Sequence, residues 1–226
     1  MEVTPKKKQK RVYLITLHKS QDILLNLLEN ASFISEVRIG SPNILDEITE
    51  SFLSSYDCII YDLQDSGFYN NVITDKKKIE ILERYIKNDR GSILVTHDHW
   101  DYTVSGPLEL IGLERNEKFS WKVSETARVC RKHELFSCYN DLSNLIEMKI
   151  APAHQTWHKI IENENNKARV LMEFQLDLAT PTRHNYLVVN ELGLGRTAYW
   201  AAGHSNYISE DEKKLFLNIV AWLTKY

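Results

Sequence analysis

Residues 91–101, GSILVTHDHWD, are the stretch from which the rest of the chain can be interpreted. Residues 92–96 form a short run of mostly apolar and β-branched residues after a glycine, which is typical of a strand buried on both faces. The side chains that follow it are polar and titratable: His97, Asp98, His99 and Asp101. Such a cluster directly after a buried strand indicates that the carboxyl end of the strand opens onto a functional site.

Three more strand patterns precede this one, and each is followed by a helical pattern. The strands are expected at residues 12–17, 36–39 and 57–61. The first helix follows Ser20, the second is capped by Asn43 and contains Phe52, and the third opens at Asp75. Alternating strands and helices predict a parallel sheet with helices on both faces. Right-handed crossovers would place the carboxyl ends of its strands on one edge.

The second half of the chain has a looser pattern that favours antiparallel strands. They are expected at residues 127–130, 146–150 and 168–176, with loop and turns over 133–145. Residues 186–191 and 196–201 flank residues 192–195 and predict a hairpin. Ser209 and Glu212 have the spacing of a capping box before the last helix. The predicted fold class is α/β, with a doubly wound, mainly parallel flavodoxin-like sheet and added antiparallel strands.

Length and composition indicate one globular domain. The chain has 226 residues, of which 43% are hydrophobic and 26% charged, enough for a sizeable core. Residues 1–11 carry a basic cluster and are expected to form a flexible tail, so the single domain comprises residues 12–226. No apolar run is long enough for a membrane helix. Three cysteines without a CxxC pair favour a reduced, cytoplasmic protein.

The net charge of −3 gives no overall attraction to nucleic acid. The expected partner is therefore a small-molecule ligand, with neither nucleic acid nor membrane, and a homo-oligomer stays open. Ligands of open α/β sheets bind outside the carboxyl ends of the strands. The polar residues that follow the expected strands are His18, Asp62, Gln64, Asp65, His97, Asp98, His99, His204 and Ser205. They predict a shared cleft, unless these loops are polar only because loops lie at the surface.

The HxHxD spacing of His97, His99 and Asp101 offers a metal alternative. It is similar to the zinc-binding segment HxHxDH of metallo-β-lactamase-like hydrolases, and imidazole and carboxylate groups suit zinc. Later ligands could be His154, Asp177 and His204. Tyr102 replaces the last histidine of that motif, and the strand–helix–strand start does not fit that family. We therefore expect no cofactor, with zinc or another divalent metal at His97, His99 and Asp101 as the alternative.

Four segments carry a resemblance to a known family. They are YDCIIYDL from residue 56, LERYIKNDRGSILVTHD from residue 82, GRTAYWAAGHS from residue 195 and NIVAWLTKY at the end of the chain. In order and shape they resemble the ThuA-like (trehalose-utilisation) proteins of the class I glutamine amidotransferase-like superfamily. The resemblance spans most of the chain from Val12 onward and is poorest over residues 113–185.

The resemblance implies a fold and, loosely, a sugar-related role, because one fold hosts many functions. In the amidotransferases the strand equivalent to residues 92–96 leads to a nucleophilic cysteine. Here His97 and Asp98 stand at that point, and glutamine hydrolysis through a thiolate needs the thiol. ThuA-like proteins also tend to lack this cysteine, and a histidine is common there.

The leading hypothesis is a ThuA-like domain that binds or acts on a small polar ligand such as a carbohydrate. The expected catalytic residues are His97, Asp98 and His204, and the expected ligand-binding residues are His18, Asp62, Gln64, His99 and Ser205. A histidine would act as general base and a carboxylate would orient it. The alternatives are a non-catalytic binding or scaffold module and a metal-dependent hydrolase.

Overall fold

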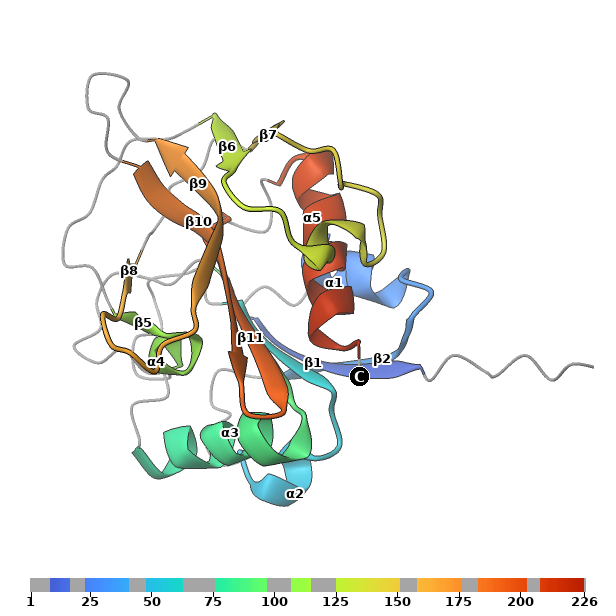
Figure 1. Ribbon diagram of the computed structural model, residues 1–226. Coiled ribbons are helices and arrows are strands. Elements are labelled where there is room, and N and C mark those ends of the chain that lie inside the picture. Colours follow the sequence, from blue (N-terminus) through green and yellow to red (C-terminus); the bar gives the residue numbers. More distant parts are fainter. Residues whose placement is uncertain are drawn as a thin grey trace, which may run out of the picture.

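A single mixed sheet forms the centre of the molecule (Figure 1). The structure is a computed structural model, and it describes residues 9–16, 23–40, 48–62, 76–96, 107–114, 125–150, 158–175, 183–202 and 208–225. Within these ranges the sheet has nine strands in the order β2-β1-β3-β4-β11-β10-β9-β6-β7. The strands are β1 Lys10–Thr16, β2 Ile34–Gly40, β3 Cys58–Asp62, β4 Ser92–Thr96, β6 Thr126–Val129, β7 Glu147–Lys149, β9 Arg169–Gln175, β10 Arg183–Leu192 and β11 Gly195–Trp200.

The first half of the order is parallel and the second half is antiparallel. Strands β2, β1, β3, β4 and β11 pair in parallel, whereas β11, β10, β9, β6 and β7 pair antiparallel. Every residue of β3 and β4 is buried, as expected for strands with neighbours on both sides and helices above and below. The predicted fold class is confirmed. Two short strands, β5 Leu113–Glu114 and β8 Lys159–Ile160, form a separate antiparallel pair.

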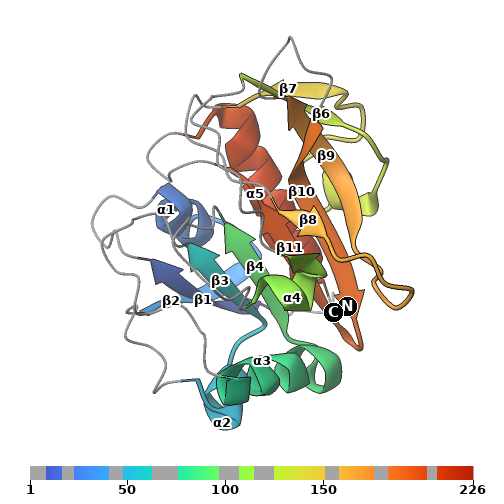
Figure 2. The same cartoon turned by 90° about the vertical axis from the view of Figure 1, so that its left-hand side faces the viewer.

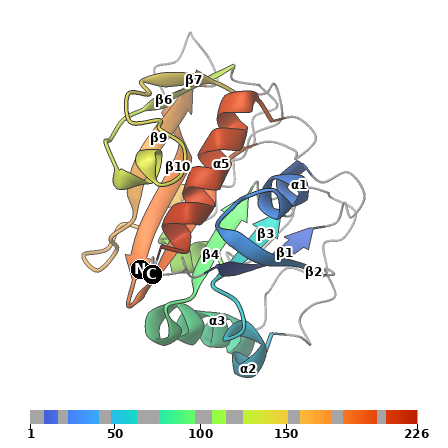
Figure 3. The same cartoon turned by 90° about the vertical axis from the view of Figure 1, so that its right-hand side faces the viewer.

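Helices cover both faces of the sheet. They are α1 Ile23–Glu29, α2 Glu50–Leu53, α3 Lys76–Asp89, α4 Leu108–Ile111 and α5 Glu210–Leu223, with the 3-10 helix η3 Glu134–Ser137. Helices α1 and α5 contact each other and lie on one face (Figure 3). Helices α2, α3 and α4 lie on the other face (Figure 2). No helix in the described part of the chain combines the length and apolar character needed to span a lipid bilayer.

Side-chain alternation along the strands assigns each residue of the parallel sheet to a face. Trp200 stacks on Phe216 of α5 with ring centroids 5.8 Å apart, so Trp200 and its neighbours across the sheet face α1 and α5. Thr197 donates to the carbonyl of Leu110 in α4, and Tyr13 packs edge-on against Phe52 of α2. The opposite face therefore belongs to α2, α3 and α4.

Two local predictions are confirmed. The hairpin of β10 and β11 turns at Gly193 and Leu194, and only Gly193, with φ of 63°, has positive φ. A glycine with positive φ at the first of two loop positions is the requirement of a type II′ turn. At the start of α5 the Ser209 hydroxyl accepts from the Glu212 amide while the Glu212 carboxylate accepts from the Ser209 amide, which completes the capping box.

One other local prediction is wrong. The helix that contains Phe52 begins at Glu50 and is capped by Thr49, whose extended backbone (φ −124°, ψ 158°) cannot continue a helix from Asn43. Residues 133–145, expected as loop and turns, consist of the short 3-10 helix η3 with bends and turns after it. In addition β1 begins at Lys10, two residues before the predicted strand.

Candidate functional site at the carboxyl edge of the sheet

Three polar residues stand directly beside one another at the carboxyl ends of β1, β3 and β4. Thr16, Asp62 and Thr96 are each the last residue of their strand. The register pairs Asp62 with Thr16 on one side and with Thr96 on the other, and Trp200 of β11 lies beyond Thr96. We call these four residues the Asp62 row. It faces α1 and α5, because Trp200 does.

Both carboxylate oxygens of Asp62 accept hydrogen bonds from this row. The Thr96 hydroxyl donates to Oδ1 at 2.7 Å, and the Thr16 hydroxyl donates to Oδ2 at 3.2 Å. Asp62 and Thr16 have no exposed surface, and Thr96 is 2% exposed. A carboxylate taken out of water loses several kcal/mol of hydration, and hydrogen bonds from the two threonine hydroxyls recover part of that loss. The two threonines therefore stabilise the buried carboxylate.

The Asp62 row occupies the topological switch point of the sheet. From β1 the chain moves outward to β2 and then returns to the other side of β1 as β3. In flavodoxin-like strand orders, ligands bind in the crevice between β1 and β3. Thr16 and Asp62 stand on its two sides and hydrogen-bond across it. The combination of a buried carboxylate and a switch point marks this edge as the candidate functional site.

The start of α5 adds a second buried carboxylate on the α5 side of the sheet. Glu212 is 1% exposed, and its Oε1 accepts from the Tyr186 hydroxyl at 2.6 Å. Burial, and then the negative charge of Glu212, raise the pKa of Tyr186 well above its usual value. Oε2 of Glu212 accepts a hydrogen bond from the Ser209 amide. This carboxylate therefore helps to fix the residue at which α5 begins.

Asp62 is the one predicted site residue that falls within the described residues. The others lie outside them: His18, Gln64, His97, Asp98, His99, Asp101, His204 and Ser205. The later metal ligands considered above, His154 and Asp177, also lie outside. Within the described ranges no group of three or more His, Cys, Asp or Glu side chains could hold a metal ion. The roles predicted for the remaining residues stay predictions.

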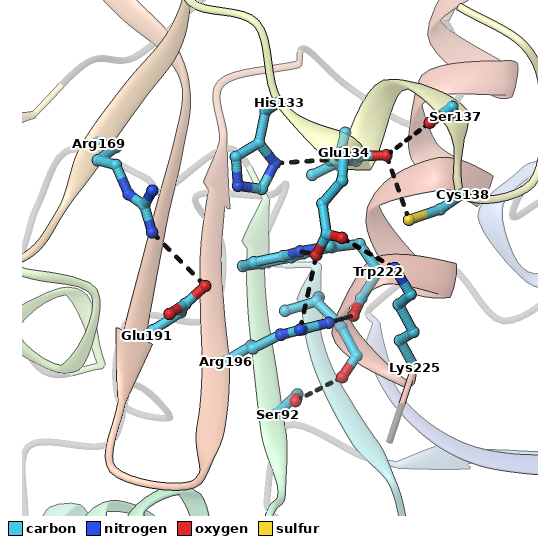
Figure 4. Close-up of polar contacts among 12 residues, drawn as sticks. Ser92, His133, Glu134, Ser137, Cys138, Arg169, Glu191, Arg196, Trp222 and Lys225 are labelled. Carbon is cyan, nitrogen blue, oxygen red and sulfur yellow. Dashed lines mark hydrogen bonds and ion pairs between the residues drawn. The ribbon is translucent and has the colours of Figure 1, made fainter. Parts of the chain in front are cut away.

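The amino ends of the same strands carry a different polar cluster, drawn in Figure 4. Arg196, 7% exposed, stands beside Ser92 in the register and lies over the ring of Trp222 at 4.8 Å from its centroid. Its guanidinium donates to the Trp222 carbonyl at 2.6 Å. The Glu134 carboxylate accepts from the Trp222 indole at 3.1 Å and from Lys225 at 2.9 Å. The hydrogen bond with Lys225 lowers the pKa of Glu134.

These contacts fasten the end of α5 to the sheet and to η3. The Ser92 hydroxyl adds a hydrogen bond to the Leu223 carbonyl at 2.7 Å. Arg196 and Ser92 therefore hold carbonyls of the last helical turn, which have no partner within a helix. We call Arg196, Glu134, Trp222 and Lys225 the amino-edge cluster.

The cysteines do not offer a nucleophile. Cys58 is fully buried in β3, and burial raises the pKa of its thiol. Burial also raises the pKa of Cys130 and of Cys138. A thiol with a raised pKa is poorly ionised at neutral pH and is a weak nucleophile.

Sequence reasoning missed three histidines that the structure places at cavities. His133 caps η3 by accepting the Leu135 amide on Nδ1, and it lines a cavity of about 740 Å³ beside η3. His158 and His184 line another cavity, of about 770 Å³, next to β8 and the start of β10. At position 133, a histidine before a polar residue and an apolar pair is a weak N-cap signal, whereas nothing in the sequence distinguishes His158 and His184.

Comparison with known proteins shows which solved structures have a similar fold. No family model matches the chain, and no curated protein sequence matches it. Among solved structures, a cytoplasmic protein of Salmonella typhimurium LT2 is similar with a TM-score of 0.63 and 15% identity, over 94% of this chain and 99% of that one. A second cytoplasmic protein of Salmonella typhimurium gives 0.59 and 13%, over 95% and 98%.

A cold-adapted β-galactosidase from Rahnella sp. R3 is similar as well, with a TM-score of 0.60 and 12% identity. The likeness covers 96% of this chain and 31% of the β-galactosidase, so the present chain corresponds to one part of that enzyme. The chain therefore shares its fold with two cytoplasmic proteins and with one part of a β-galactosidase. At these identities the likeness concerns the fold alone.

Proposed function

We propose that this chain is a ThuA-like domain that binds, and through His97 and His204 acts on, a small carbohydrate at the carboxyl edge of its sheet. The observation that carries the proposal is Asp62, a fully buried carboxylate at the switch point between β1 and β3. A buried carboxylate beside such a crevice is typical of a functional site.

Sequence order supports the assignment of the other residues. His97 and Asp98 directly follow Thr96, and His204 and Ser205 follow Trp200 after three residues. Thr96 and Trp200 are members of the Asp62 row, so these loops begin at neighbouring points of the sheet. In the proposal Asp62 positions the loops through Thr16 and Thr96, His97 is the general base and His204 completes the site. The β-galactosidase likeness favours a sugar as the ligand class, and the two similar cytoplasmic proteins favour a cytoplasmic location.

A binding module without catalysis is the second candidate. The observation in its favour is the residue after Thr96, which is His97 and not the cysteine of the amidotransferases. Turnover of a hydrolysable sugar derivative, such as a nitrophenyl galactoside, separates the two: release of nitrophenol that is lost in His97→Ala supports the enzyme, and binding without release supports the module.

The test of the shared proposal is a thermal-shift titration with galactose, mannose, lactose and trehalose. At least one sugar should raise the Tm of the wild-type protein, and His97→Ala and His204→Ala should abolish that rise. His133→Asn, at the opposite end of the strands, is the matched control and should respond as wild type. Unchanged shifts in both His97→Ala and His204→Ala would remove the proposed site.

Elemental analysis decides the metal alternative. If the proposed function is right, we expect no stoichiometric metal in protein purified without chelators. One equivalent of zinc that is lost in His97→Ala and His99→Ala would replace the proposal with metal-dependent hydrolysis through His97, His99 and Asp101.

A further inference from the structure

Strand β2 lies at one edge of the nine-stranded sheet (Figure 3). Among the described residues its only strand neighbour is β1. Glu36 and Arg38 of β2 are exposed, whereas Val37 and Ile39 are partly buried. An edge strand presents backbone amides and carbonyls that can pair with the strand of another chain. The edge of β2 is therefore a candidate interaction surface.

The backbone groups of Val37 point away from the sheet. The Arg11 amide donates to the Asp57 carboxylate and the Arg11 carbonyl accepts from the Asp57 amide, so the backbone of Arg11 is directed toward β3. Because backbone directions alternate along a strand, the next residue, Val12, is directed toward β2. Val12 is in register with Val37 and therefore bonds the residues on either side of it. The amides and carbonyls of Val37 and Ile39 are left on the outer edge.

The order of charges along β2 is self-complementary. If two copies of β2 pair antiparallel about Val37, Glu36 of one copy stands opposite Arg38 of the other, on both sides of the two-fold axis. A pairing centred on Glu36 or on Arg38 would place like charges opposite each other, which is unfavourable. Val37 is also the middle residue of Ile34–Gly40, so the register that matches the charges pairs the entire strand.

Contacts within the chain hold both charged side chains at this edge. The Arg11 guanidinium donates to the Glu36 carboxylate at 2.8 Å and 3.3 Å. Arg38 lies over the Phe52 ring, 5.3 Å from its centroid. A carboxylate has about four acceptor positions, so Glu36 can accept from a second guanidinium as well. Side chains that are already ordered lose less entropy when a partner binds.

The opposite edge of the sheet is less suited to such pairing. Strand β7 comprises only Glu147–Lys149. Ile146 and Ile150 bond the β6 side through their carbonyl and amide, so the backbone of Lys149, one residue before Ile150, points outward. Its carbonyl accepts from the Ser209 hydroxyl at 2.8 Å. The start of α5 thus occupies an acceptor on the β7 edge, and β2 is the longer of the two edges.

We propose that two copies of this chain form a dimer by antiparallel pairing of their β2 strands about Val37. The pairing joins the two sheets, and the parallel strands of the two copies run in opposite directions. We expect a weak dimer, with a dissociation constant of roughly 10–100 µM, because an edge-to-edge contact is smaller than a standard interface. The dimer does not depend on the proposed function.

Sedimentation equilibrium on charge-reversed proteins tests the dimer. Glu36→Arg and Arg38→Glu each turn two opposite-charge pairs into two like-charge pairs, and each should weaken self-association by about tenfold or more. An equimolar mixture of the two variants should associate with nearly wild-type affinity, because the mixed dimer again places opposite charges across the axis. Lys149→Glu, a charge reversal at the β7 edge, is the matched control and should associate as wild type.

Three results would overturn the proposal: a wild-type protein that stays monomeric well above the expected dissociation constant, a dimer that persists in both variants, and a mixture that fails to associate. Urea denaturation checks that each variant is folded, since Glu36→Arg removes the partner of Arg11.

Hydrogen–deuterium exchange needs no variant. In the wild-type protein the amides of Val37 and Ile39 should exchange more slowly as protein concentration rises. Association without this protection would place the interface elsewhere and overturn the proposal. A sugar response that is absent while the dimer forms would remove only the proposed function.

Discussion

Both ends of the parallel strands carry buried polar groups on the same face of the sheet, but the partners of these groups differ. Arg196 and Trp200 are four residues apart in β11, about 13 Å along the strand. At the amino end, Arg196 lies 3.6 Å from the Glu134 carboxylate and donates to the Trp222 carbonyl of α5. At the carboxyl end, Asp62 is buried beside two neutral threonines. The first arrangement stabilises the fold, and the second is the one for which we propose a role in ligand binding.

The comparison predicts that changes at the amino edge alter stability and leave ligand binding intact, whereas a change at Asp62 does the opposite.

Arg196→Ala should cause the largest loss, about 3 kcal/mol in the free energy of unfolding, measured by urea denaturation. The change removes the packing on Trp222 and the hydrogen bond to its carbonyl. Arg169→Ala is the matched control: its 3.5 Å ion pair with Glu191 is partly exposed and should be worth less than about 1 kcal/mol. Equal losses in the free energy of unfolding for the two variants would show that the amino-edge cluster stabilises the fold no more than an exposed ion pair does.

Gly193→Ala should lower stability by about 2 kcal/mol. The residue has φ of 63°, and a Cβ there would stand 2.6 Å from Lys87 Cα and 2.7 Å from the Lys87 oxygen. The turn must therefore shift away from the end of α3. Leu194→Ala, in the same turn and 51% exposed, should change stability by less than about 0.5 kcal/mol. A Gly193→Ala protein as stable as wild type would contradict the described turn.

His133 should make stability depend on pH. Burial, and then the positive charge of Arg169, lower the pKa of His133; Arg196 acts in the same direction, whereas Glu134 and Glu191 oppose it. A histidine with a lowered pKa favours folding in its neutral form. Its contribution is therefore complete above the unfolded pKa of about 6.5 and is lost as the pH falls below that value.

The His133→Asn variant keeps a side-chain acceptor for the η3 cap and removes the titrating group. Its free energy of unfolding should fall less between pH 7.5 and pH 5.5 than that of the wild-type protein. His184, whose pKa burial also lowers, should supply part of the slope that remains. An unchanged slope in His133→Asn would exclude His133 as a source of the pH dependence.

The sequence predicted the elements that depend on local patterns. The apolar run at residues 92–96 gave β4 with its observed bounds, and the Ser209–Glu212 spacing gave the capping box. The start of α2 was misplaced because Asn43 and Thr49 are both good N-caps, and the choice between them is made by tertiary packing. The two-residue strands β5 and β8 join positions about 45 residues apart and leave no local pattern.

The site was predictable only in outline. That Asp62 ends a strand followed from the sequence, but its position beside Thr16 and Thr96 depends on strand order, which local patterns do not encode. The cavity of about 770 Å³ beside β8 was missed because residues 158–162 and 183–185 are distant in sequence and become neighbours only in the folded chain. Histidines in irregular segments gave no signal of that proximity.

Asp62→Asn tests the central claim most directly, with unfolding and sugar binding measured on the same protein. The amide keeps an acceptor for Thr96 and can donate to Thr16, so stability should stay within about 1 kcal/mol of the wild-type value or rise. The Tm rise that galactose, mannose, lactose or trehalose produces in the wild-type protein should be lost. A protein that loses several kcal/mol but keeps the sugar response would show that Asp62 serves the fold and would contradict the account.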